Sequence, residues 1–154
     1  MRASEIRTFV RPVHSVKRVA EKLSIALLVR DNAPLSQIVV FEALVSPTDL
    51  SVELLNIHLT ARLEYVKFAP NNNEAPVISG QFAFFRKTGD KDEVRLNTVV
   101  RLHGEGHIIL PGGGVIDVDG SSGIDEAEEF TIREAVSVAL LSELIEAMPA
   151  WSFN

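Results

Sequence analysis

The sequence predicts an α+β fold, in which a curved antiparallel sheet of about four strands is packed with a long C-terminal helix. Apolar and polar residues alternate along the middle of the chain, which is the pattern of strands buried on one face. Short turn-forming runs separate these stretches, and such short connections favour antiparallel neighbours over parallel strands. The last third of the chain instead has apolar residues at helical spacing. We therefore expect one domain over residues 1–154.

Residues 1–39 form an N-terminal extension whose structure the sequence leaves open. Its middle has apolar residues at helical spacing, at Val16, Val19, Ala20 and Leu23. Ser15 is the expected N-cap of such a helix. From Leu23 to Val29, however, apolar residues alternate as in a strand. A helix that changes into a strand and one long strand therefore both fit residues 16–29, and a turn follows at residues 30–34.

The sheet is expected within residues 40–110. A short β-rich run lies at residues 36–45, and three long strands are expected at residues 52–68, 77–87 and 93–110. Adjacent residues of a strand point to opposite faces, so Phe84 and Phe85 cannot both enter the core. One of them covers the other face of the sheet or is offered to a partner.

An acidic, glycine-rich loop at residues 111–126 leads into the long helix, which is expected at residues 127–148. The apolar stripe of this helix consists of Ile132, Ala135, Val136, Ala139, Leu140, Leu144 and Ile145. The start of the helix also carries acids, which the helix dipole favours there: Glu126, Glu128 and Glu129. Pro149 ends the helix.

The loop before this helix raises the question of a calcium site. Residues 117–128 place acids or a hydroxyl at positions 1, 3, 5, 9 and 12 of a twelve-residue run, as a calcium loop does. However, Ser122 stands where the sharp turn needs glycine, and the segment before the loop is not helical in pattern. Acids also serve as caps and dipole partners at a helix start. We expect that role here and no calcium binding.

A second candidate metal site is the run His103–His107, which reads HGEGH. In one continuous strand, His103, Glu105 and His107 share a face, but the two histidines are about 13 Å apart at ~3.3 Å per residue. One ion with nitrogen ligands at about 2.0–2.1 Å cannot be held by both. We therefore expect a polar strand surface at this place and no metal.

Composition excludes several classes of protein. The chain has 154 residues, a formal net charge of −6 and no cysteine, so it has no thiol nucleophile, disulfide or cysteine zinc site. An acidic chain is not expected to bind nucleic acid, although basic residues gather near its start: Arg2, Arg7, Arg11, Lys17, Arg18 and Lys22. No run approaches the ~18–20 apolar residues that span a membrane, and no signal peptide is visible. We expect a cytoplasmic protein with no membrane partner, no cofactor and no catalytic set.

The order of the elements and three short motifs resemble the SecB family of export chaperones. The motifs are Phe41-Glu42 at the first strand, Ile132-Arg133-Glu134 on the helix, and the end from Pro149 to Phe153. The resemblance runs from about Val40 to Asn154. It departs from the family at residues 128–131, where EEFT replaces the expected LFPY, and in the acidic loop, which has no counterpart. The resemblance implies a four-stranded antiparallel sheet and an acidic tetrameric holdase without enzymatic activity.

On this resemblance we expect a non-enzymatic SecB-like chaperone or peptide-binding protein, which holds apolar segments of unfolded clients and forms a homo-oligomer. The candidate client-binding residues are Leu44, Leu50, Leu54, Trp151 and Phe153. Two other classes stay open. One is a structural or assembly subunit that uses its sheet for oligomerisation. The other is a small-ligand binder or enzyme on a cystatin-like cone, with a polar set of Arg62, Glu64, His103 and Glu105.

Overall fold

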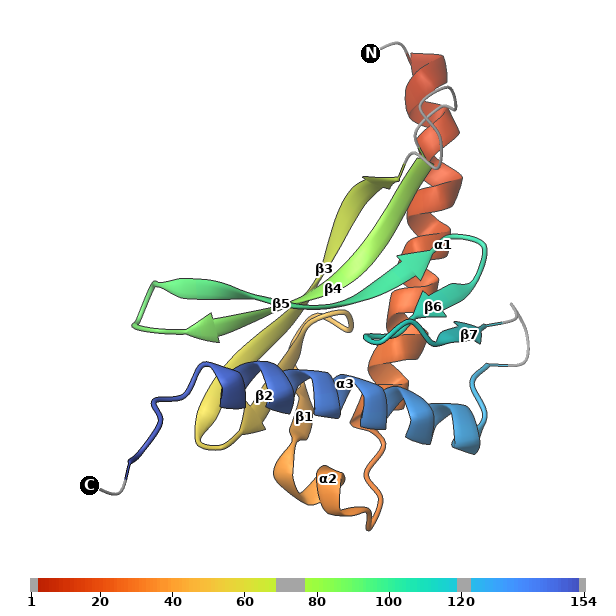
Figure 1. The fold of residues 1–154 in the computed structure, drawn as a ribbon. Coiled ribbons are helices and arrows are strands. Elements are labelled where there is room, and N and C mark those ends of the chain that lie inside the picture. The colour runs from red at the N-terminus through yellow and green to blue at the C-terminus, as the bar shows by residue number, and fades with distance from the viewer. Residues whose placement is uncertain (1–2, 69–76, 119–122, 153–154) are drawn as a thin grey trace.

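The fold is a curled antiparallel sheet with two long helices packed against it (Figure 1). The computed structural model describes residues 3–68, 77–118 and 123–152. The sheet is entirely antiparallel, and its strands are ordered as they occur in the sequence. One core unites the inner face of the sheet with both long helices. The predicted α+β class, the antiparallel sheet and the C-terminal helix are confirmed.

The N-terminal extension is helical, which decides between the two interpretations of residues 16–29. Helix α1 spans Ala3–Leu28 and contains both Pro12 and Ser15, so the expectation of an N-cap at Ser15 is wrong. Its predicted helical stripe of Val16, Val19, Ala20 and Leu23 enters the core, and the structure adds Ala26 and Leu27 to it. A Cβ at Gly80 of the sheet would lie 2.4 Å from Val16 Cγ1, so glycine there permits the close approach of α1. A short helix, α2 (Pro34–Ile38), follows α1.

The sheet has seven strands, and the expectation of about four is wrong. The strands are β1 (Val40–Ala43), β2 (Leu50–Leu54), β3 (Ile57–Phe68), β4 (Val77–Lys87), β5 (Glu93–His103), β6 (His107–Ile109) and β7 (Val115–Asp117). Two of the long strands expected from the sequence are each folded into a hairpin. A third additional strand, β7, forms within the segment that was expected to be loop.

Tight turns account for the two extra hairpins. Leu55 and Asn56 both have positive φ, 52° and 59°, as a two-residue hairpin turn of the primed type requires. The second turn reverses the chain between His103 and His107, which pair directly with each other. Gly106 within it has a φ of 98°, and a Cβ there would lie 2.5 Å from the carbonyl oxygen of Val118. Only glycine meets both demands, so the turn depends on this residue.

The two faces of the sheet differ chemically. Phe84 is fully buried in the core, whereas Phe85 lies on the outer face. There the guanidinium carbons of Arg62 and Arg95 lie 4.0 and 5.4 Å from the centre of its ring. The prediction that the two phenylalanines serve opposite faces is confirmed. Because the two arginines cover its ring, Phe85 packs on the outer face of the sheet and is not exposed to a partner protein.

Helix α3 spans Glu126–Glu146 and begins with a capping box. The side chain of Asp125 accepts a hydrogen bond from Glu128 N at 2.8 Å, and the side chain of Glu128 accepts one from Asp125 N at 3.2 Å. Two of the acids in the candidate calcium loop are therefore used as helix caps. The expected apolar stripe is buried at Ile132, Val136, Leu140 and Leu144. Ile145 is an exception, because it is exposed.

Candidate functional site

Helix α3 is apolar on two sides, and only one side is covered. In Figure 1, α3 crosses in front of the sheet and of α1, with its outer side toward the viewer. The outer side carries large apolar residues about two helical turns apart, and they continue into the turn after the helix: Phe130, Val138, Ile145 and Met148. We call these four residues the α3 surface. Each is between 42% and 55% exposed.

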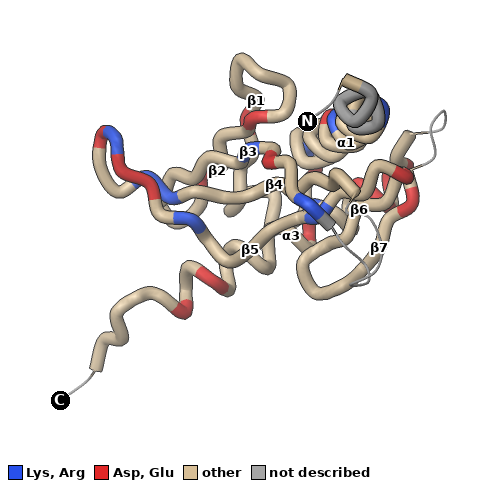
Figure 2. Tube along the Cα trace, turned by 90° about the horizontal axis from the view of Figure 1, so that it is seen from above, with Lys and Arg blue, Asp and Glu red and all other residues tan. Residues whose placement is uncertain are grey.

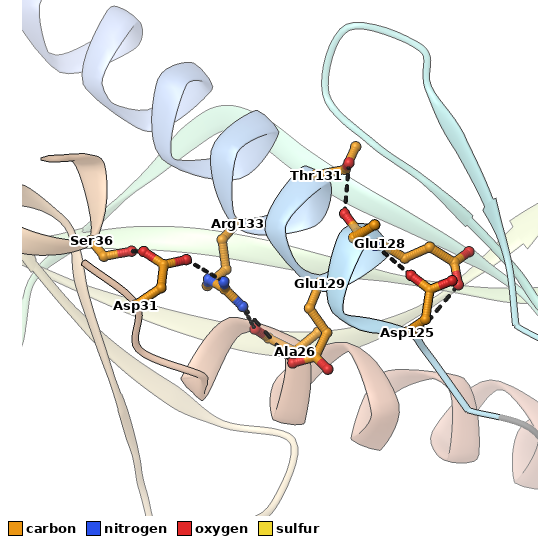
Figure 3. A network of polar contacts seen from close by, with 9 residues as sticks. Ala26, Asp31, Ser36, Asp125, Glu128, Glu129, Thr131 and Arg133 are labelled. Carbon is orange, nitrogen blue, oxygen red and sulfur yellow. Dashed lines mark hydrogen bonds and ion pairs between the residues drawn. The ribbon is translucent and has the colours of Figure 1, made fainter. Parts of the chain in front are cut away.

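Arg133 fixes the first half of α3 to the end of α1 (Figure 3). Its guanidinium is almost completely buried and donates hydrogen bonds to the carbonyl of Ala26, at 3.2 Å, and to the carboxylate of Asp31. The carboxylate of Glu129, one turn earlier on α3, lies 3.9 Å away. These contacts join α3 to the segment that leads from α1 into α2.

Asp31 is held ionised in this network. Ser36 donates a hydrogen bond to it at 2.7 Å and the backbone of Ala33 donates another at 2.9 Å. The hydrogen bond from Ser36, together with those from Arg133 and Ala33, lowers the pKa of Asp31 from its ordinary 3.8 to about 2. Asp31 therefore positions α2 against α3 at every pH above the acid range.

Glu143 fixes the second half of α3 to the sheet. Its carboxylate accepts hydrogen bonds from the backbone amides of Asn97 and Thr98 at 2.7 and 2.8 Å, and from the hydroxyl of Thr98 at 2.8 Å. These amides lie where the pairing of β4 with β5 is irregular, near Ala83 and Phe85. A bulge leaves backbone donors without a strand partner, and Glu143 satisfies two of them.

Two hollows flank the outer side of α3. One, of about 170 Å³, lies between α2 and α3, and its apolar walls include Pro34, Leu35 and Phe130. The other, of about 480 Å³, lies between α3 and the turn after β6, with Pro111 and Val138 in its walls. Glu134 borders both hollows. The part of the α3 surface at Phe130 and Val138 therefore has a hollow on each side, and contacts in both halves of the helix hold it in place.

The residues expected to bind clients do not lie together on this surface. Leu50 and Leu54 are 1% exposed and belong to the core, so they cannot contact a client in this conformation. Leu44 is exposed but lines a different hollow, beside Ile57 and Arg86. Trp151, in the tail after α3, is 80% exposed. Phe153 lies outside the described residues.

Sequence reasoning missed Phe130, Val138, Pro34 and Leu35. The signal for the first two was present, because α3 has apolar residues on more of its circumference than one buried stripe requires. Pro34 and Leu35 could not be found, since their place beside α3 depends on the contact of Asp31 with Arg133.

The polar set of the cystatin-like alternative does not converge. Arg62 and Glu64 belong to two cross-strand ion pairs on the outer face, Arg62 with Glu93 at 2.8 Å and Arg95 with Glu64 at 2.6 Å. The hydrogen bond from Arg95 keeps the pKa of Glu64 below its ordinary value. The register places Arg62 level with Val99 and not with His103. Arg62 and Glu64 therefore act as ion-pair partners across the outer face of the sheet, and Arg62 does not lie beside His103.

Charges elsewhere are mixed or local. Figure 2 shows basic and acidic residues side by side along the hairpin of β4 and β5. On α1, Arg11 and Arg18 line a shallow hollow with His14.

Among residues 3–68, 77–118 and 123–152, no three His, Asp or Glu side chains are placed to hold one metal ion. Asp119, Ser121 and Ser122 of the candidate calcium loop lie outside these ranges, so the expectation of no calcium binding stays a prediction. No helix of the described chain is long and apolar enough to cross a membrane.

No protein-family model, curated protein or solved structure matches this chain. The α3 surface and its two hollows are therefore the features of the molecule that bear on its function.

Proposed function

We propose that this protein is a non-enzymatic, SecB-like chaperone or peptide-binding protein that holds apolar segments of unfolded proteins. The observation that carries the proposal is the α3 surface, an exposed apolar strip on a helix whose opposite side is fully buried. Exposed apolar strips of this kind are typical of protein-binding surfaces. The motif Ile132-Arg133-Glu134, which suggested the SecB resemblance, lies on this helix.

The hollows suit the side chains of an extended client. Each has mainly apolar walls, and the two lie on opposite sides of Glu134. A segment crossing α3 would place apolar side chains in the hollows and its backbone over the helix. Glu134 and the net charge of −6 favour segments in which Lys or Arg stands beside the apolar residues.

The test compares two aspartate substitutions on exposed helical positions. Val138 on α3 is 47% exposed and Ile25 on α1 is 63% exposed, so neither change opens the core. Wild-type protein and Ile25→Asp should suppress the aggregation of a chemically unfolded client protein, and Val138→Asp should lose most of this effect. Equal suppression by both variants, or none by the wild type, would reject the proposal.

The second candidate function is an assembly subunit, and the same surface favours it. A helix with two apolar sides is also what a second copy of this chain would cover. Light scattering after size-exclusion chromatography separates the two functions. If Val138→Asp dissociates an oligomer and the wild type holds no client, the α3 surface is an assembly interface. If the variant keeps its oligomeric state and loses the client, the surface binds clients.

A further inference from the structure

Two histidines and an aspartate lie in one row across β5, β6 and β7. The register pairs His103 with His107, and His107 with Asp117. Directly opposed residues of antiparallel strands have Cα atoms only about 4.5–5.5 Å apart. The neighbouring pair, Leu102 and Ile108, is fully buried in the core. Because side chains alternate along a strand, the row that contains the histidines lies on the outer face.

Because His103 and His107 are paired in a hairpin, the sequence-based argument against a metal site at these two residues does not hold. The separation of about 13 Å assumed a continuous strand, but residues 104–106 form a turn in which Gly106 N donates a hydrogen bond to His103 O at 3.0 Å. A second hydrogen bond, from Val118 N to Gly106 O at 2.6 Å, holds the turn against the residue that follows β7. The pairing of the histidines is thus fixed by the backbone.

The carboxylate of Asp117 orients one of the imidazoles. Asp117 Oδ1 lies 2.5 Å from His107 Nδ1. With the proton on Nδ1 donated to the carboxylate, Nε2 keeps the lone pair that binds metals. This carboxylate–histidine arrangement is the usual support of a metal-ligating histidine. It makes His107 the better prepared ligand of the pair.

We propose that His103 and His107 bind one divalent transition-metal ion of the zinc type, with Asp117 as the residue that positions His107. Two nitrogen ligands of a tetrahedral ion are about 3.3 Å apart when each lies about 2.0–2.1 Å from the metal, a spacing that opposed side chains can reach. Water completes the coordination. The site needs two imidazoles, not a group of three protein donors. His103 also makes a polar or ring contact of its own.

The test is a calorimetric titration of the full chain with zinc chloride at neutral pH, after removal of metals. We expect one ion per chain for the wild type, no specific binding by His103→Ala or His107→Ala, and affinity 10- to 100-fold weaker for Asp117→Asn. The two remaining histidines give matched controls, so His14→Ala and His58→Ala should bind as the wild type does. Circular dichroism checks that each variant is folded.

Nitrogen NMR of the imidazoles gives a second readout. Before zinc is added, His107 should carry its proton on Nδ1, and zinc should shift the Nε2 resonance of His107 together with one nitrogen of His103. Three results would each overturn the proposal: no zinc binding by the wild type, wild-type affinity in folded His103→Ala or His107→Ala, and an equal loss in the His14 or His58 control.

Discussion

Replacing Leu140 with alanine tests whether the inner side of α3 is a packed surface. Leu140 has no exposed surface and belongs to the same core as residues of α1 and the sheet. Removing a leucine side chain from such a site costs the transfer free energy of the lost carbons and that of the cavity, together about 2–5 kcal/mol. At about 2–4 °C per kcal/mol for a chain of this size, the melting temperature should fall by about 4–20 °C.

The assay is urea denaturation followed by circular dichroism, repeated at several protein concentrations so that any oligomer is recognised. Val138→Ala on the outer side of the same helix is the matched control, and it should change the free energy of unfolding by about 0.5 kcal/mol or less. The reasoning fails if Leu140→Ala costs less than about 0.5 kcal/mol, or if the control costs as much as Leu140→Ala.

Three further predictions concern the polar contacts of α3. Glu143→Gln weakens the hydrogen bonds to the amides of Asn97 and Thr98, so it should cost about 1–2 kcal/mol and speed hydrogen exchange there; unchanged exchange would contradict this. Because the pKa of Asp31 is lowered to about 2, its contribution to stability is present above about pH 4 and is lost as the pH falls through 2. The stability difference between wild type and Asp31→Asn should therefore shrink over that range, and a constant difference would count against the network. Millimolar calcium should leave the melting temperature unchanged, because Asp125 and Glu128 already cap α3; a rise of several degrees that Asp117→Ala abolishes would restore the calcium hypothesis.

The strands could be predicted from the sequence better than the turns between them. The alternation of β2 buries Leu50, Val52 and Leu54, and that of β3 buries Leu59 and Ala61, so the pattern shifts by one residue at the turn. This shift could not be recognised in the sequence, because Leu55 of the turn is apolar and continues the apolar pattern of β2. At residues 104–106 no shift occurs, since a three-residue turn returns the chain to the same face. The two glycines around Glu105 were the signal of that turn.

The surface of α3 was only partly predictable for a different reason. Periodicity identifies a helix and its apolar residues, but it cannot say which of two apolar sides another element covers. That choice depends on α1, which the sequence left undecided between helix and strand. It also depends on Arg133 and Glu143, whose partners Asp31 and Thr98 are far away in the chain.

Site-specific photo-crosslinking tests the central claim most directly. A photoreactive residue is placed at Val138 on the α3 surface and, as the control, at Ile25 on α1, and each protein is irradiated with a labelled unfolded client. The account predicts a client crosslink from position 138 and little or none from position 25. A crosslink from position 25 alone, or from position 138 only to a second copy of this chain, would contradict the claim that the α3 surface holds clients.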